Sequence, residues 1–376
     1  MRKIVDFDAQ SLAKTVWALA TARVEAPRLY DTVAKHAAGR TAKFNARDLA
    51  TIVWAYAHAK VPAPGLFDAV ALEAARKVAT SVDCVPVGSL AVEDGARGSD
   101  AADGWSTRFD DWSLSNTAWA YATASHAAPR LFGALAGAAV SKADSFNGQS
   151  LANIAWAYAT ANVEAPELFE AVALETPRKT ATFSAQGLAN IAWAYAVAGH
   201  ASPHLFKAVA EEAPLKMADA TAQVEAFNAQ DVANTAWALS TAEVAAPQLF
   251  CAFAAHAVLT MGAFNAQALT NTAWAFATAG HANNSLFDAL ARRALDRADD
   301  APDAAFDDDY VRDDAFDDGG SLDASTSSGT KRLLLSTFTD QALANTAWAY
   351  ATAGVEAPLL FDAIAAEVPR RVETFA

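Results

Sequence analysis

The sequence predicts an all-α protein, an α-solenoid of about eight helix-turn-helix repeats of 37 residues, and three periodic features carry this prediction. A tryptophan within an alanine-rich stretch, such as 151–160, recurs at Trp17, Trp54, Trp119, Trp156, Trp193, Trp237, Trp274 and Trp348. Four of the seven gaps are 37 residues, and the others (65, 44 and 74) are 37 plus 28, 7 and 37. A phenylalanine precedes each tryptophan by ten residues, and a proline follows seven of them by ten. Self-similarity at such a period marks stacked repeats.

The first helix of each repeat is predicted to begin just after the phenylalanine. The next residue can always accept hydrogen bonds from the open amides of a first turn, and it is Asp8, Asn45, Asp110, Asn147, Ser184, Asn228, Asn265 or Thr339. In the fourth repeat, Leu151, Ala155, Trp156 and Ala159 fall on one face at helical spacing. This helix is expected to end near 160–163.

The prolines predict where the second helices begin, because a proline at the first helical position loses no hydrogen bond. They are Pro27, Pro64, Pro129, Pro166, Pro203, Pro247 and Pro358, and Asn284 takes this position in the seventh repeat. A further proline (Pro177, Pro214 or Pro369) is expected to end the second helix early in three repeats.

Three segments interrupt the period and define the domain organisation. Repeats occupy 7–80, 109–219, 227–300 and 338–374. Residues 81–108 are rich in Gly, Ser and Asp and predict a loop, and 220–226 are a short extension. Residues 301–337 contain a run of aspartates and predict an acidic disordered insertion.

The formal charge of −15 argues at first against a nucleic-acid ligand, but it is unevenly distributed. Twelve Asp against two Arg between Asp296 and Asp323 give −10 and leave −5 for the rest of the chain. No run of 18 apolar residues predicts a membrane span. The segment before Phe7 is too short for a transit peptide, so any targeting segment is either absent or missing from this chain.

No catalytic constellation, cofactor motif or metal site is predicted, so we expect no enzyme. Cys84 and Cys251 have no metal or disulfide spacing. His126, His200 and His281 occupy one position in successive turns, where one histidine per repeat cannot assemble a metal site. We interpret them as loop histidines.

Polar residues on the first helix form the first candidate site. Gln149 and Asn153 are four residues apart and share a face, and the pair recurs in four other repeats. The functional interpretation is contact with RNA bases by Lys14, Thr51, Asn116, Asn153, Asn190, Asn234, Asn271 and Asn345. The structural alternative is an amide ladder that satisfies the backbone or neighbouring side chains between repeats.

A basic register is the second candidate site, 23 residues after the tryptophan. It comprises Arg40, Lys77, Lys142, Lys179, Lys216, Arg297 and Arg371, and only Thr260 breaks it. Such a column, on one shared surface, would bind the phosphates of a single strand. The alternative is local pairing, because Glu73, Glu175, Glu212 and Glu367 lie four residues before four of these cations.

The pattern Phe-Asn-x-Gln-x-Leu-Ala-Asn-Thr-x-Trp-Ala-x-Ala, as in 227–240 and 338–351, resembles repeats of organellar RNA-binding proteins. These are the octotricopeptide repeat proteins and the heptatricopeptide repeats of RAP-domain and FAST-kinase-like proteins. The resemblance covers all eight repeats. It implies binding of single-stranded RNA in the mitochondrial matrix or chloroplast, and a role in RNA processing, stability or translation. The Pro-Pro-Pro-Glu-Trp signature of octotricopeptide units is absent, and no RAP-like domain follows the repeats.

Two functions are therefore carried forward. The first is a repeat protein that binds single-stranded RNA, with protein partners as a further possibility. It is expected to have no cofactor and no association with a membrane. The alternative is a protein-protein interaction scaffold that binds no nucleic acid, which the acidic net charge favours. In a third arrangement, the segment 301–337 folds onto the basic register and blocks it.

Overall fold

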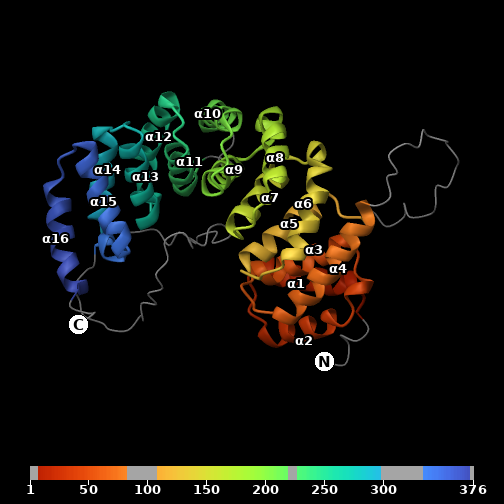
Figure 1. Cartoon of the computed structure of the whole chain (residues 1–376). Helices are drawn as coiled ribbons and strands as arrows, with labels where there is room; N and C mark the ends of the chain where they lie inside the picture. The colour runs from red at the N-terminus through yellow and green to blue at the C-terminus, as the bar shows by residue number, and fades with distance from the viewer. Residues whose placement is uncertain (1–6, 83–107, 219–226, 298–332, 373–376) are drawn as a thin grey trace. The chain divides into compact units, whose positions relative to one another are not determined.

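The computed structural model describes residues 7–82, 108–218, 227–297 and 333–372, and within them the protein is all-α. The chain divides into two compact units, Met1–Arg178 and Lys179–Ala376, and each is described by itself. Both units are built from antiparallel helix pairs that stack on one another (Figure 1). The predicted α-solenoid is thereby confirmed.

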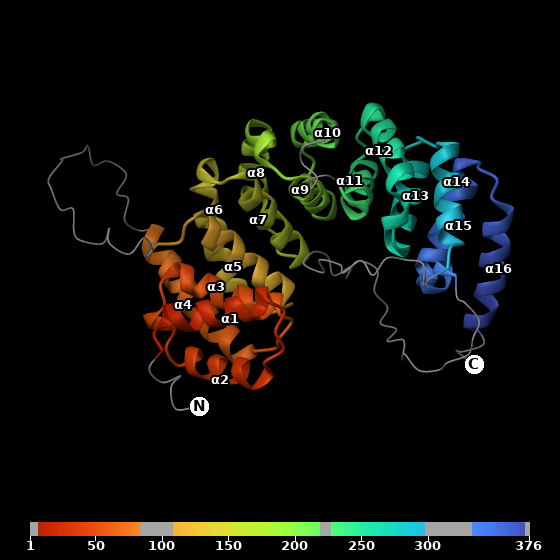
Figure 2. The ribbon, with the colours of Figure 1, turned by 180° about the vertical axis from the view of Figure 1, so that it is seen from behind.

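The described residues of unit 1 form four helix pairs. Its helices are α1 (Ala9–Thr21), α2 (Pro27–Ala38), α3 (Ala46–His58), α4 (Pro64–Val82), α5 (Asp111–Thr123), α6 (Pro129–Val140), α7 (Gly148–Thr160) and α8 (Pro166–Lys179). The first helices of the repeats, α1, α3, α5 and α7, pack side by side in chain order, and α2, α4 and α6 follow the same order in a second layer (Figure 2).

Unit 2 repeats this arrangement. Its helices are α9 (Ala185–Val197), α10 (Pro203–Ala218), α11 (Ala229–Thr241), α12 (Pro247–Thr260), α13 (Ala266–Thr278), α14 (Asn284–Ala294), α15 (Asp340–Ala353) and α16 (Pro358–Val372). The first helices α9, α11, α13 and α15 form one layer, and α10, α12, α14 and α16 form the other. Short 3₁₀ helices precede several first helices: η2 (Thr41–Lys43), η3 (Ala143–Ser145), η4 (Thr180–Thr182), η5 (Met261–Ala263) and η7 (Leu334–Thr337).

Every predicted cap of a first helix is confirmed. All eight side chains accept a hydrogen bond from the backbone N–H three residues later, at 2.7–3.1 Å. Such a bond satisfies one of the four amides that a helix start leaves open. The phenylalanine before the cap is buried in every repeat except the first, where Phe7 is 36% exposed.

The second helices begin at the predicted residues, namely the seven prolines and Asn284. The expectation that an inner proline ends the helix early was wrong. Pro177, Pro214 and Pro369 lie inside helices that continue beyond them. A proline has a helical φ and removes a single N–H donor, so a helix that is already packed can pass through it near its end.

The turn between the two helices has one geometry throughout. The residue six positions after the tryptophan has a positive φ in all eight repeats, between 48° and 68°. It is glycine in three repeats and Arg23, Lys60, Ser125, Asn162 or Glu243 in the others. The next N–H bonds back to the carbonyl five residues earlier, as His126 N–H does to Tyr121 at 3.0 Å. This left-handed turn satisfies carbonyls at the helix end.

A buried tyrosine joins repeats 2, 3, 4 and 8 to the repeat before each of them. The Tyr158 hydroxyl on α7 donates to the Phe132 carbonyl on α6 at 2.5 Å, and the ring of Phe132 meets Tyr158 edge-on at 5.0 Å. The same bond recurs at 2.6 Å from Tyr56, Tyr121 and Tyr350. Each therefore fixes a first helix to the second helix of the repeat before it.

Two of the predicted insertions are shorter in the structure than the sequence indicated, because helices extend into their ends. Residues 81 and 82 end α4, and 333–337, which had been assigned to the acidic insertion, include η7. Arg297 and Leu333 form an antiparallel bridge, and the Leu334 N–H donates to the Asp296 carbonyl at 2.7 Å. The predicted disorder of the acidic insertion and the extension at 220–226 lie outside the described residues.

Candidate nucleic-acid interface

The first helices present a repeated stripe of polar and aromatic side chains, which we call the amide–indole stripe. In α7 it consists of Gln149, Asn153, Trp156 and Thr160, which recur at i, i+4, i+7 and i+11 and so share one face. The opposite face carries the buried leucine and tyrosine. Gln149 is exposed at the start of the stripe, Asn153 and Trp156 are buried, and Thr160 is partly exposed.

The tryptophans of neighbouring stripes contact one another. Ring centroids lie 6.2 Å apart for Trp54 and Trp119, 6.5 Å for Trp119 and Trp156, and 6.4 Å for Trp274 and Trp348, at tilts of 30–32°. Trp119 and Trp156 are 2–3% exposed, whereas Trp17 is 45% exposed. In unit 1, Trp54, Trp119 and Trp156 thus form a row of neighbouring indoles, of which Trp54 is partly exposed and the other two are buried.

The residues predicted to contact RNA bases are mostly buried. Thr51, Asn116, Asn153, Asn190 and Asn234 are 4–9% exposed, whereas Asn271 and Asn345 are partly exposed and Lys14 is exposed. Two of these amides have partners within their own helix: Asn116 Nδ2 donates to the Trp112 carbonyl at 2.9 Å, and Asn345 accepts from Gln341 at 3.0 Å. These contacts agree with the structural alternative, and base contact stays a prediction.

The basic register lies at the ends of the second helices, where Lys142, Lys216 and Arg371 bind backbone carbonyls. Lys142 Nζ donates to the Phe109 carbonyl at 2.6 Å, which ties the end of α6 to the start of α5 in the same repeat. Lys216 Nζ reaches the Ala181 carbonyl at 3.0 Å in the same way. Arg297 is exposed at the bridge to Leu333. Arg40 and Lys179 also have interaction partners.

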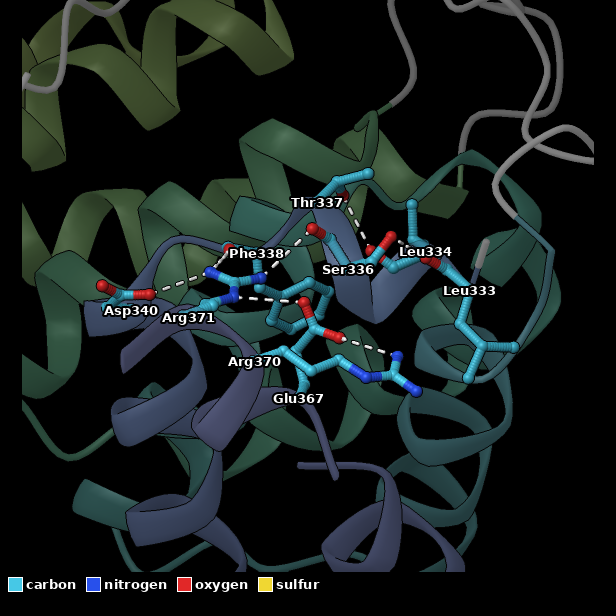
Figure 3. Close-up of polar contacts among 9 residues, drawn as sticks. All are labelled: Leu333, Leu334, Ser336, Thr337, Phe338, Asp340, Glu367, Arg370 and Arg371. Carbon is cyan, nitrogen blue, oxygen red and sulfur yellow. Dashed lines mark hydrogen bonds and ion pairs between the residues drawn. The ribbon is translucent and has the colours of Figure 1, made fainter. Parts of the chain in front are cut away.

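Arg371 shows how fully such a cation is engaged (Figure 3). Its guanidinium donates to the carbonyls of Phe338 at 2.6 Å and Ser336 at 3.1 Å, and to the carboxylates of Asp340 at 2.9 Å and Glu367 at 3.2 Å. The side chain is 21% exposed. The neighbouring Arg370 points away and is 76% exposed. Arg371 therefore holds η7, the start of α15 and the end of α16 together.

Local ion pairs supply the second contact of the register, as the alternative interpretation expected. Glu73 pairs with Lys77 at 3.3 Å, Glu212 with Lys216 at 3.9 Å, and Glu367 with Arg371 at 3.2 Å. Glu175 pairs with Arg178 at 2.7 Å. Phosphate binding by the register stays a prediction, and it now competes with carbonyl and carboxylate partners.

Sequence reasoning missed two further side chains that lie near the end of a second helix and contact the carbonyl of the phenylalanine of the same repeat. His256 Nε2 lies 2.8 Å from the Phe227 carbonyl, and Arg293 Nε lies 3.2 Å from the Phe264 carbonyl. Both sit one helical turn before the basic register. The signal was available in repeat 6, where Thr260 breaks the register and a histidine stands four residues earlier.

Charged groups inside the first helices are few. Asp231 in α11 is 4% exposed and accepts from the Asn228 N–H at 3.0 Å, while Asn228 accepts from the Asp231 N–H at 2.9 Å. Burial raises the pKa of Asp231 to about 6, and the hydrogen bond opposes this shift. His126 Nε2 lies 2.9 Å from Asp68 Oδ1 and packs against Phe67, in agreement with a structural role in the turn.

The described residues hold no group of three or more His, Cys, Asp or Glu that would ligate a metal ion. Among their helices, none is both long and apolar enough to cross a membrane.

Stacked helix pairs with one repeated face define an α-solenoid repeat protein, in which each pair adds one register to an extended surface. Residues 119–305 match the model of a family described as RNA-editing substrate-binding complex 6 protein. The match begins at Trp119 in α5 and continues past the end of α14. This description names RNA, but neither the octotricopeptide nor the heptatricopeptide repeat families. No curated protein matches the chain.

Proposed function

We propose that this chain is an RNA-associated helical-repeat protein that acts in RNA processing, with RNA editing as the process. The match of residues 119–305 to a family described by an RNA-editing substrate-binding complex carries this proposal. That description names a complex, so we include protein partners. From the organellar resemblance of the repeats we further propose that the protein works in mitochondria or chloroplasts, which imaging of a tagged protein in its native cell would test.

The ligand that suits the amide–indole stripe best is single-stranded RNA. Unpaired bases stack on aromatic side chains and accept hydrogen bonds from amides. The tryptophan recurs in all eight repeats, and the Gln–Asn pair recurs in five of them. The glutamines support this proposal more directly than the asparagines, because Gln149, Gln186 and Gln267 are exposed. A double helix hides its base faces by stacking and pairs the Watson–Crick edges of its bases, so neither is available to such a surface.

Equilibrium binding tests this proposal. Fluorescence anisotropy of labelled single-stranded and double-stranded RNA of 20 nucleotides is measured with the full chain between 50 and 200 mM salt. We expect preference for the single strand and a fall in affinity with salt of about 0.7 log units per log unit of salt for each phosphate bound. Binding that is equal for both forms, or no binding, overturns the proposal.

One observation favours the scaffold as the second candidate. Cations of the basic register are bound to backbone carbonyls or to glutamates, as Lys142 and Arg371 are. In addition, single exposed leucines lie on the second helices. Leu72, Leu174, Leu215 and Leu259 are 62–85% exposed. If the purified chain binds no RNA, crosslinking of the protein in its native extract followed by mass spectrometry distinguishes a scaffold, which yields reproducible protein partners.

A further inference from the structure

Positive charge in unit 1 is concentrated in its first two repeats. Described residues 7–82 hold ten Lys and Arg against six Asp and Glu, a balance of +4, whereas 108–178 hold four against seven, a balance of −3. The total charge of −15 hides this difference. A local excess of cations on an acidic chain is the electrostatic feature that a polyanion recognises.

Two of these cations stand inside the amide–indole stripe. Lys14 in α1 occupies the position of Asn153, and Arg47 in α3 occupies the position of Gln149. Lys14 is exposed, and the Arg47 side chain is 40% exposed. Because α1 and α3 pack side by side, both cations lie on the same face of the first-helix layer.

Accessible aromatic rings accompany the two cations. Trp17 is 45% exposed one turn after Lys14. Trp54 is partly exposed and stacks on His58, with ring centroids 4.5 Å apart and planes 15° from parallel. In contrast, Trp119 and Trp156 in the next two repeats are buried. Charge and accessible indoles therefore coincide in α1 and α3.

Both cations already have partners. Arg47 lies 3.6 Å from Asp110 and 4.4 Å from the centre of the Trp112 ring. Lys14 interacts electrostatically with Asp8 and Asp48. The Arg47 and Asp110 side chains are 40% and 38% exposed, and Lys14 and Asp8 are both exposed. Pairs between exposed side chains hold little free energy, so a phosphate can replace Asp110 and Asp8 as partners of these cations. Lys142 and Arg371 differ, because they donate short hydrogen bonds to backbone carbonyls.

We propose that the first-helix face of repeats 1 and 2 is the anchoring site for single-stranded RNA, with phosphates on Lys14 and Arg47 and bases stacked on Trp17 and Trp54. This inference rests on the proposed RNA-binding function and names where that function is concentrated. The proposed phosphate contacts therefore lie in the first two repeats of the stripe, and not along the evenly spaced basic register. Aromatic stacking next to a cation binds single strands irrespective of sequence.

The test measures anisotropy of a labelled eight-nucleotide oligouridine with the full chain. We expect Lys14→Gln/Arg47→Gln to weaken binding about tenfold and to lower the salt slope by about 1.4, since two phosphate contacts are lost at 0.7 each. The control is Arg76→Gln/Arg178→Gln, which removes the same charge from exposed positions on α4 and α8. It should change affinity less than twofold.

A second pair of variants tests the stacking. Trp17→Ala should weaken binding about tenfold, within the range for one lost base stack. Trp348→Ala removes an indole of equal exposure, 46%, from α15, whose stripe carries Gln341 and Asn345 instead of cations, and should change affinity less than twofold. Thermal unfolding followed by circular dichroism verifies that each variant is folded.

The outcomes separate the two proposals. If the unaltered chain binds RNA and the control variants lose as much affinity as the site variants, the anchoring site is refuted and RNA binding stands. If the unaltered chain binds no RNA, the proposed function fails and the anchoring site fails with it. A selective loss in both site variants supports both.

Discussion

At the scale of single residues, the left-handed turn after each first helix carries strain where it lacks glycine. Glu243 has a φ of 54°, and Gly280 has a φ of 68° at the same position of the next repeat. A side chain in this conformation costs about 1–2 kcal/mol. A Cβ built on Gly280 meets no atom within 4 Å, so the strain there is confined to the backbone.

We therefore expect Glu243→Gly to stabilise the protein by about 1 kcal/mol and Gly280→Ala to destabilise it by a similar amount. Urea unfolding of the two variants provides the measurement. Changes of the same sign in the two variants would contradict the strain argument, because each substitution is the control for the other.

The buried carboxyl of Asp231 predicts a pH dependence of stability. Its folded pKa is raised to about 6 by burial, against an unfolded value of about 3.9. The folded protein thus binds this proton more tightly. The stability from this residue is present below about pH 4 and is lost as pH rises through about 6.

Asp231→Asn removes this dependence of stability on pH and keeps an oxygen that can accept a hydrogen bond from the Asn228 N–H. We expect the variant to be more stable than the parent at pH 7 by about 3 kcal/mol and similar to it at pH 4. Thermal melts between pH 4 and 8 test this. Asp8→Asn is the control of opposite sign, because a hydrogen bond from the Ser11 amide lowers the pKa of Asp8. If the stability of the parent relative to Asp231→Asn rises between pH 4 and 6, the raised pKa is not that of Asp231.

At the scale of elements, the tyrosine bond is the recurrent connection between a first helix and the preceding repeat. Repeat 7 provides a natural variant, because Phe276 stands where repeat 4 has Tyr158. Phe276 meets Phe250 at 5.0 Å and 82°, and Tyr158 meets Phe132 at 5.0 Å and 84°. The ring therefore keeps its place without the hydroxyl, and the hydroxyl contributes only its hydrogen bond.

Tyr158→Phe should accordingly destabilise the protein by about 1 kcal/mol, the usual net value of a hydrogen bond, without a cavity cost. The reverse change, Phe276→Tyr, places a hydroxyl near the Phe250 carbonyl and should stabilise by a similar amount. Urea unfolding of both variants measures the two values. A loss above about 3 kcal/mol in Tyr158→Phe would mean that the hydroxyl positions the helix as well.

The elements were predictable to the extent that local chemistry determines them. Asn147 and Pro166 mark helix starts within three residues of themselves, so the sequence was sufficient there. Pro177 misled, since packing around α8 outweighs a local propensity. The bond from Lys142 to Phe109 joins residues 33 apart and needs the folded hairpin to be visible.

At the scale of the whole chain, periodicity reveals which side chains share a register but not how accessible they are. Asn153 and Lys14 occupy equivalent positions, yet one is 8% exposed and the other is exposed, because neighbouring helices cover the first. In the basic register, Lys142, Lys216 and Arg371 donate to backbone carbonyls, which the linear spacing of these cations does not reveal. Exposure depends on the packing of consecutive repeats, which a linear pattern does not contain.

The acidic segment 298–332 begins and ends at one point of unit 2, because Arg297 and Leu333 are paired. Its eleven Asp against Arg312, Lys331 and Arg332 give −8. Replacing it by Asn-Gly, a two-residue turn suited to antiparallel pairs, leaves the contact of α13 with α15 unchanged. Shortening this connection from 35 to 2 residues halves its length about four times, and each halving lowers the entropic cost of closing the connection by about 0.6 kcal/mol. The free energy of unfolding of the variant, measured in urea, should therefore rise by about 2 kcal/mol.

The same deletion tests whether the acidic segment blocks RNA binding. Removing a charge of −8 should raise affinity for any polyanion, so a full-length chain with the order of 298–332 shuffled serves as the control. If the segment acts only through its charge, the shuffled chain binds oligouridine as the parent does and the deletion binds more tightly at low salt alone. If it occupies Lys14 and Arg47 specifically, shuffling also raises affinity and Lys14→Gln/Arg47→Gln abolishes the gain. Unchanged affinity in the deletion variant refutes blocking of either kind.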